Sequence, residues 1–277
     1  MFSYSALQDL IDGLEEGNKF HITVRFFPGF GNAKTEVRWE NSIHAVPFCD
    51  ASKRQVLGLR RCLICKAMTV RKADECRRSF AGNCINGVYE YCHPVFLKEE
   101  LCCIIYIGNI VRDREEFCKK NGLQPEDPIL DTMELHFDEK LYPRLGALLE
   151  SYIRMLFEQY PESNREKSRY AVVPQVRRYV DRYYFLELSL SQLARIYHYN
   201  EKYLGRLFKQ QVGLSFNEYL NEKRLEYGKE RLLRSKDSVL DISANAGFRN
   251  VTYFNRMFKR RYGVSPTQYR RERVYNG

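Results

Sequence analysis

The chain has 277 residues, 44% of them hydrophobic, a length and composition that suit about two globular domains with ordinary cores. No run of about 18 apolar residues occurs, and the acidic N-terminal stretch lacks the basic region of a signal peptide, so we expect a cytoplasmic protein without a membrane span. The net charge of +10 is concentrated in residues 169–277, where 22 Lys and Arg face 10 Asp and Glu. This excess predicts a polyanionic partner, nucleic acid or a membrane surface.

The elements predicted for the first half follow from apolar spacing, because a period near 3.6 indicates a helix and alternation indicates a strand. In chain order they are a helix over 5–17, strands over 21–27 and 35–40, a helix around 70–80, and a hairpin of two strands over 88–97 and 101–111.

A long helical pattern follows over residues 137–159. Its apolar residues are spaced 4, 3, 4, 3, which is a two-heptad seam and predicts a helix that helps to form a homodimer: Leu141, Leu145, Leu148, Tyr152 and Met155. The polar segment 161–170 is the predicted interdomain linker. The expected organisation is therefore a domain over 1–136, a connector helix with its linker over 137–172, and a second domain over 173–277.

The second domain contains an internal repeat. A shift of 50 residues aligns eight identities: Tyr203, Arg206, Phe208, Lys209, Gly213, Ser215, Tyr219 and Glu222 meet Tyr253, Arg256, Phe258, Lys259, Gly263, Ser265, Tyr269 and Glu272. Each copy reads as a short helix, a tight turn and a longer helix rich in cations. That is the pattern of a helix-turn-helix motif.

Local signals mark the ends of the two longer helices. Asn200 and Asn250 are predicted N-caps, and Gly213 and Gly263 are predicted to follow the last turns. A continuous helical pattern over 215–235 joins the copies and would span roughly 31 Å at 1.5 Å per residue. One turn of B-DNA is about 34 Å long, so the two longer helices could enter successive major grooves.

With these features, residues 173–273 resemble the DNA-binding domain of AraC/XylS-family transcription regulators. The closing pattern GF-x5-F-x3-F-x4-G-x-S-P-x-x-Y-R, from Gly247 to Arg270, carries the resemblance. Ser243 stands where the family usually has Ala. Gly228 lies within the joining helix, where a glycine costs about 1 kcal/mol against Ala and predicts a softer linker.

The resemblance also sorts the residues of the longer helices. Eight are expected in the core: Tyr203, Leu204, Leu207, Phe208, Tyr253, Phe254, Met257 and Phe258. The residues at groove-facing family positions are Glu201, Lys202, Arg206, Lys209, Val251, Thr252, Asn255, Arg256 and Lys259. Arg pairs with guanine, Asn with adenine, and Val or Thr contacts the thymine methyl group, whereas Lys209 and Lys259 are expected at phosphates.

The N-terminal domain resembles the PocR-type sensory domain, a PAS-like ligand-binding module. The motifs are FC-x3-K at Phe48, GL-x2-C at Gly58 and C-x2-GV-x-E-x3-PV at Cys84. The resemblance implies that a small organic effector is sensed, with Cys49, Cys62, Cys84 and Glu90 as effector-binding candidates.

All nine cysteines lie between Cys49 and Cys118. Cys62 and Cys65 form a CxxC pair but lack the second pair of a structural zinc site, so Cys49, Cys62, Cys65 and Cys84 are candidate zinc ligands if they converge. Redox sensing and plain packing remain alternatives, and Cys102 and Cys103 are expected in the core. The protein is not expected to require a cofactor.

The predicted fold is α+β, with an N-terminal PAS-like α/β sensory domain, a helical connector and a C-terminal all-α domain with two helix-turn-helix motifs. No Walker A, HExxH or GxSxG motif occurs, which argues against an enzyme. We expect an effector-controlled regulator that binds promoter DNA as a homodimer, and, by family habit, activates transcription with RNA polymerase as a partner. The alternative is a constitutive DNA-binding regulator whose N-terminal domain holds zinc or contacts other proteins.

Overall fold

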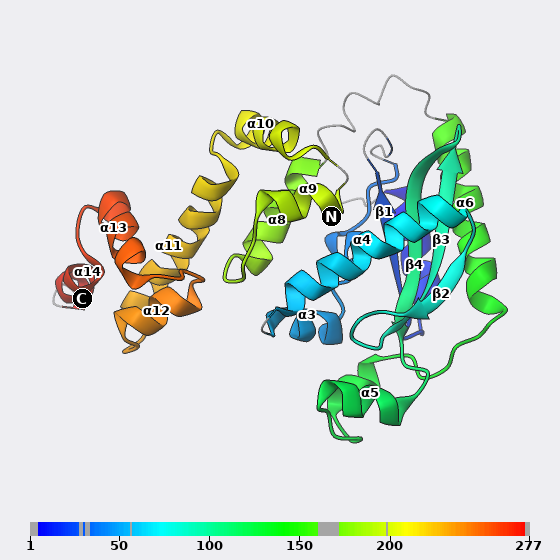
Figure 1. Ribbon diagram of the computed structural model, residues 1–277, viewed down its shortest axis with the longest axis horizontal. Helices are drawn as coiled ribbons and strands as arrows, with labels where there is room; N and C mark the ends of the chain where they lie inside the picture. The colour runs from blue at the N-terminus through cyan, green and yellow to red at the C-terminus, as the bar shows by residue number, and fades with distance from the viewer. Residues whose placement is uncertain are drawn as a thin grey trace. The chain divides into compact units, whose positions relative to one another are not determined.

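The computed structural model describes residues 5–27, 30, 34–55, 57–159, 172–197 and 199–274 (Figure 1). The chain divides into two units: Met1–Val172 with Ile196–His198, and Val173–Arg195 with Tyr199–Gly277. We call them the N-terminal and the C-terminal unit and describe each by itself. The predicted linker 161–170 lies outside the described residues.

A four-stranded antiparallel sheet forms the centre of the N-terminal unit, in the order β1-β4-β3-β2. Its strands are β1 (His21–Phe26), β2 (Phe80–Asn83), β3 (Tyr89–Leu97) and β4 (Glu100–Ile110). The predicted hairpin is confirmed as β3 and β4. Residues 102–110 of β4 are all buried, including Cys102 and Cys103, as expected for an apolar strand covered on both faces.

Helices cover both faces of this sheet. Helices α1 (Ala6–Glu15) and α6 (Leu141–Gln159) share one apolar cluster with Ile22, Val24 and Ile105. On the other face, α4 (Gly58–Cys76) packs Val70 and Ala73 against β4; Figure 1 shows this helix crossing the strands. The remaining elements are short: α2 (Trp39–Ser42), α3 (Pro47–Arg54), α5 (Arg114–Asn121) and a 3-10 helix (Pro128–Thr132).

The helix predicted around 70–80 is α4, which begins at Gly58 and ends at Cys76. Arg77 adopts φ 48°, and its backbone N–H donates to Ala73 O at 3.0 Å, which closes α4 at Cys76. Phe80 then starts β2 and pairs with Cys92.

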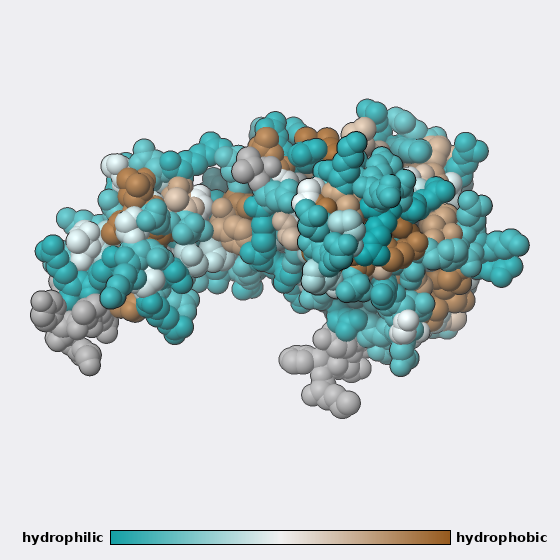
Figure 2. Space-filling model, turned by 90° about the horizontal axis from the view of Figure 1, so that it is seen from below, coloured by the Kyte–Doolittle hydropathy of each residue, from teal (hydrophilic) through white to brown (hydrophobic). Residues whose placement is uncertain are grey.

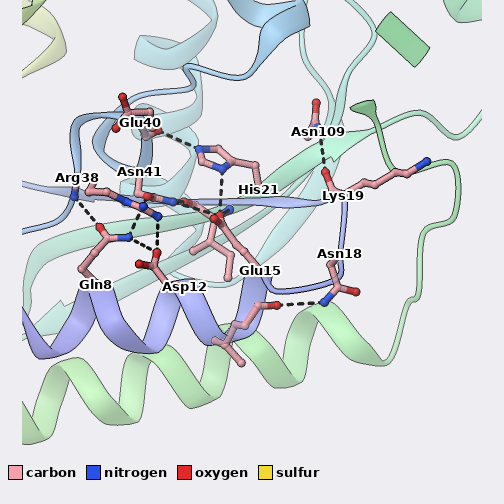
Figure 3. Close-up of polar contacts among 12 residues, drawn as sticks. Gln8, Asp12, Glu15, Asn18, Lys19, His21, Arg38, Glu40, Asn41 and Asn109 are labelled. Carbon is pink, nitrogen blue, oxygen red and sulfur yellow. Dashed lines mark hydrogen bonds and ion pairs between the residues drawn. The ribbon is translucent and has the colours of Figure 1, made fainter. Parts of the chain in front are cut away.

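The strand predicted over 35–40 is wrong. Its backbone is held by side chains of α1 instead of a ladder: Arg38 N donates to Gln8 Oε1 at 2.5 Å (Figure 3). Asn41 Nδ2 donates to Ile22 O at 2.8 Å, so that α2 caps the free edge of β1. Gln8 Nε2 in turn donates to Asn41 Oδ1 at 3.1 Å. A buried polar network therefore overrides the alternation around Trp39.

Helix α6 confirms the predicted long helix but corrects its seam. It buries Tyr142, Leu145, Leu149, Ile153 and Leu156 against the sheet and α1. Leu145 thus belongs to the core of its own unit and is not free for a partner. Leu141, Leu148 and Met155 are 37%, 48% and 37% exposed and recur every seven residues.

The described part of the C-terminal unit is helical throughout. It contains α8 (Val172–Tyr183), α9 (Leu190–Ile196), α10 (Glu201–Val212), α11 (Phe216–Arg234), α12 (Val239–Asn245), α13 (Val251–Tyr262) and α14 (Pro266–Val274). Buried rings of α13 and α14 form a core with Leu225, Leu232 and Ile242 of α11 and α12. The predicted joining helix is confirmed as α11.

Candidate nucleic-acid interface and ligand pocket

Two helix pairs carry the candidate DNA-binding residues, α9 with α10 and α12 with α13. The predicted caps of the second helices are confirmed: Asn200 Oδ1 accepts from Tyr203 N at 3.2 Å, and Asn250 Oδ1 from Thr252 N at 2.7 Å. Gly213 and Gly263 adopt φ 80° and 85°, and each backbone N–H donates to the helix it ends. Both helices therefore begin and end where short local signals place them.

The core side of these helices is mostly as predicted. Leu204, Leu207, Phe208, Phe254 and Phe258 are buried, and Met257 is half-buried.

Tyr203 and Tyr253 were predicted in the core, and this is wrong, because they are 37% and 38% exposed. The ring of Tyr203 stacks on Tyr199 with an interplanar angle of 2°, and the Tyr253 hydroxyl accepts from Asn221 Nδ2 at 3.3 Å. A tyrosine can keep its hydroxyl in water while its ring lies against the helix, so a helical spacing of apolar residues does not by itself show that the tyrosine is buried.

The predicted groove-facing residues lie on the outer faces of α10 and α13. All are exposed except Val251, which is half-buried. Lys202, Arg206, Lys209, Arg256 and Lys259 form no ion pair among the described residues. Figure 2 shows that hydrophilic side chains also predominate on one whole face of the molecule, where hydrophobic ones form separate patches. The two faces thus present exposed cations that form no ion pair with a described acidic side chain.

The outer face of α13 carries more cations than the predicted groove-facing residues alone. Arg260 and Arg261 are exposed in the last turn of α13, whereas the first copy has Gln210 and Gln211 at these positions. Arg261 Nε lies 3.6 Å from Glu222 Oε1, so Arg260 is the less restrained of the two. Both were visible in the sequence as departures from the repeat. The Arg256 guanidinium lies over the exposed Tyr253 ring at 5.2 Å.

Helix α11 contacts α10 of the first pair and both helices of the second pair. Its N-terminus is closed by a capping box of Ser215 and Glu218. Arg224 Nε and Nη2 donate to Tyr184 O at 2.7 Å and Leu186 O at 2.9 Å, and burial lowers the pKa of Arg224 to about 10. These bonds fix α11 to the segment that follows α8.

Gly228, which was predicted to soften the joining helix, has a packing role in α11. A Cβ at this position would lie 2.9 Å from Cε2 of Phe254, a ring that is fully buried. The missing side chain lets α13 approach α11 closely, so the glycine serves packing. Gly247 has a similar role in the turn between α12 and α13, with φ +90° and a virtual Cβ 2.7 Å from Phe185 O.

In the N-terminal unit, Glu90 lies at the centre of a buried charged cluster. Lys66 Nζ donates to Glu90 Oε2 at 2.8 Å and to His44 Nε2 at 3.1 Å. His44 Nδ1 lies 2.5 Å from Glu90 Oε1, and Lys66 Nζ lies over the Tyr106 ring at 4.1 Å. We call Glu90, Lys66 and His44 the buried triad.

Burial and the neighbouring charges, respectively, lower the pKa values of His44 and Glu90. Burial lowers the pKa of His44 to about 4, so the imidazole is neutral near pH 7. Burial alone would raise the pKa of Glu90, but His44 and Lys66 outweigh it and hold that pKa at about 2. The triad is therefore an ion pair bridged by a neutral histidine, which donates from Nδ1 and accepts at Nε2.

A surface pocket of about 410 Å³ opens between α4 and strands β2 and β3. Two of the four effector-binding candidates, Glu90 and Cys84, line it together with Cys65 and Cys92. Cys92 was not predicted, because only its pairing with Phe80 brings it there. The other two candidates do not line this pocket; Cys49 packs instead against an apolar cluster that contains Phe48.

The cysteines do not assemble a metal site in the described part of the chain, where no three His, Cys, Asp or Glu side chains are arranged to hold a metal ion. Burial raises the pKa of Cys49 to about 12, and it also raises the pKa values of Cys65 and Cys84. These thiols are therefore protonated near pH 7 when no metal ion is bound.

Among the described helices, none is both long and apolar enough to cross a bilayer.

Comparisons with known proteins address the C-terminal unit. Residues 193–272 match the family model of a helix-turn-helix domain. The HTH-type transcriptional regulator YijO of Escherichia coli (strain K12) is 30% identical over 145 residues, covering 52% of this chain and 50% of YijO. The regulatory protein PocR of Salmonella typhimurium is 33% identical over 95 residues, covering 34% of this chain and 31% of PocR.

Among solved structures, the C-terminal domain of AraT, a response regulator from Geobacillus stearothermophilus, is 34% identical, with a TM-score of 0.36 over 37% of this chain and 85% of that one. The chain spans about half the length of YijO and less than a third of PocR. Its relatives are transcriptional regulators, not enzymes. Residues 193–272 thus match a helix-turn-helix domain of the kind found in transcriptional regulators.

Proposed function

We propose that this chain is a transcription regulator that binds double-stranded promoter DNA in a sequence-specific manner through α10 and α13. The observation that carries the proposal is the outer face of each helix, where cations without acidic partners stand beside hydrogen-bonding side chains. Each is the second helix of a pair, the position from which a helix-turn-helix motif enters the major groove.

The residue types suit distinct tasks in that groove. Arg206 and Arg256 can each donate two hydrogen bonds to a guanine edge, and Asn255 can pair with adenine. Thr252 and the half-buried Val251 offer methyl groups to thymine. The remaining cations, Lys202, Lys209 and Lys259, are suited to phosphates, where they add affinity without sequence choice, and Glu201 can accept from cytosine.

We further propose that both pairs bind the same DNA as two helix-turn-helix motifs. Helix α11 has 19 residues and spans about 28 Å, slightly less than one helical turn of B-DNA. One chain would then occupy two successive major grooves about 10 base pairs apart. Hydroxyl-radical footprinting of the full chain on its operator tests this layout, since protection confined to one groove per chain would contradict it.

For the N-terminal unit we propose a PAS-like sensory domain that binds a small organic effector. The pocket beneath α4, with Glu90 and Cys84 in its wall, supports this role. A ligand at 100 times its Kd adds about 2.7 kcal/mol to the folded state, so thermal unfolding with and without metabolites detects it. Reporter transcription with an identified effector then distinguishes activation, with RNA polymerase as the partner, from repression.

The competing function is a constitutive regulator whose N-terminal unit is held together by zinc or serves only protein contacts. The described residues bring no three ligating side chains together, which favours a unit that folds without zinc. Metal analysis of the reduced, purified protein decides the point. About one zinc per chain, lost in Cys62→Ser together with N-terminal folding, would favour the competing function.

We also propose that the protein is a homodimer and that the partner of α6 is the same helix of a second copy. The exposed Leu141, Leu148 and Met155 lie one heptad apart, the spacing of a helix–helix seam.

A further inference from the structure

Among the buried side chains of the N-terminal unit with polar atoms that no described residue satisfies, three lie close together on the sheet. They are Thr23 Oγ1, Arg25 Nε and Nη2, and the Tyr106 hydroxyl. Their side chains are deeply buried, with residue exposures of 2%, 7% and 1%. Buried polar groups almost always have partners, so three unsatisfied ones in one place indicate a ligand rather than chance.

The three side chains lie on the same face of the sheet. On β1 they alternate with Ile22 and Val24, which belong to the cluster beneath α1 and α6. Tyr106 is directly opposite Thr23 in the β1–β4 ladder, where paired Cβ atoms are about 5 Å apart. Arg25 follows two residues later, about 7 Å along the strand. All three therefore project toward the side that α4 covers.

The charged side chains on this face leave one cation, Arg25, without a counter-ion. Lys66 and Glu90 neutralise each other, and His44 is neutral near pH 7. Arg25 forms no ion pair with any described residue. A buried cation without a counter-ion is costly, and a bound anion removes that cost.

We propose that this face binds a small carboxylic acid, with Arg25 holding the carboxylate and Thr23 and Tyr106 donating to its oxygens. Nε–H and Nη2–H lie on one edge of a guanidinium and match the two oxygens of a planar carboxylate. The surroundings are apolar: Arg25 Cζ lies 5.9 Å from the Phe27 ring centroid, and Phe27 clusters with Ile104. A short hydrocarbon tail suits such a lining. Thr23, Arg25 and Tyr106 do not line the pocket of Glu90 and Cys84, so this is a second candidate site. Its regulatory role rests on the proposed sensory function, whereas its binding of an acid can be measured independently of that function.

The test uses the full chain and Trp39, its single tryptophan, which is 8% exposed in α2 beside β1. Thermal unfolding is followed by tryptophan fluorescence with acetate, butyrate and phenylacetate, and with their amides, at constant ionic strength. We expect at least one acid to raise the midpoint by several degrees and its amide to leave it unchanged. Inorganic phosphate at the same concentration should also leave it unchanged.

Variants separate a ligand site from plain structure. Tyr106→Phe and Arg25→Gln remove atoms that lack partners in the unliganded protein, so its midpoint should stay the same or rise. We expect the affinity for the acid to fall at least tenfold in Tyr106→Phe and at least a hundredfold in Arg25→Gln. The exposed Arg77→Gln should bind the acid as the wild type does.

Several results would overturn the proposal: no acid stabilises the protein, phosphate or the amide stabilises it equally, or Arg25→Gln binds unchanged. A lower midpoint of both unliganded variants would show that the groups already have partners. Acid binding that leaves DNA affinity unaltered would retain the site and remove only its role as effector site.

Discussion

Replacing Glu90 by Gln should destabilise the N-terminal unit far more than a surface charge change would. The glutamine keeps the shape of the side chain but leaves Lys66, whose side chain is 13% exposed, as a buried cation without its carboxylate. Breaking a buried pair by removing one partner costs about 3–5 kcal/mol. For a unit of this size each kcal/mol lowers the unfolding midpoint by roughly 2–4 °C, so a fall of about 10 °C is expected.

Trp39 fluorescence reports this loss selectively, because the single tryptophan lies in the N-terminal unit. Glu150→Gln is the matched control: Glu150 also pairs with a histidine, His93 at 2.6 Å, but its side chain is 25% exposed. Glu150 is nearer to solvent than Glu90, and its histidine partner His93 is not a buried permanent cation like Lys66, so this change should cost less than Glu90→Gln. If Glu90→Gln costs no more than Glu150→Gln, the buried triad does not hold this unit together and the reasoning is refuted.

The remaining predictions concern His44 of the buried triad, the joining helix α11 and the dimer. The folded pKa of His44, about 4, lies below the ordinary 6.5, so its stabilising contribution is complete above pH 6.5 and is lost as the pH falls toward 4, by about 3 kcal/mol in total. Urea unfolding at pH 7 and pH 4.5 should show a smaller difference in His44→Gln than in the wild type, and equal differences would contradict the assignment. Gly228→Ala should lose about 1 kcal/mol, because overpacking against Phe254 outweighs the helical preference for alanine; a gain in stability by circular dichroism would refute close packing. Leu148→Asp should convert the dimer to a monomer in analytical ultracentrifugation, with the exposed Glu158→Gln as control, and a surviving dimer would place the interface elsewhere.

The sequence predicted the C-terminal unit best because its signals are local. The caps at Asn200 and Asn250 and the ends at Gly213 and Gly263 depend on residues within one turn of each helix. The exposure of Tyr203 was missed, since an apolar period does not distinguish a buried ring from one lying on the surface.

The N-terminal unit was harder to predict because its decisive contacts are long-range. The segment around Trp39 alternates like a strand, yet Gln8 and Asn41 hold it in another conformation. Glu90 was identified through a family motif, but its partners Lys66 and His44 come from separate segments that only the folded chain brings together.

Specific reading of DNA by α10 and α13 is the central claim, and binding-site selection tests it most directly. The full chain and Arg256→Ala each select from a random duplex library, and every base position is then measured at one stated salt concentration. Loss of a two-bond guanine contact costs about 1–3 kcal/mol, so Arg256→Ala should relax the preference at one base pair by roughly 5- to 150-fold. Arg234→Ala, an exposed arginine of α11 that pairs with Glu230 at 3.0 Å, should select the wild-type sequence. An Arg256→Ala protein that selects the same sequence with undiminished preference would contradict the account.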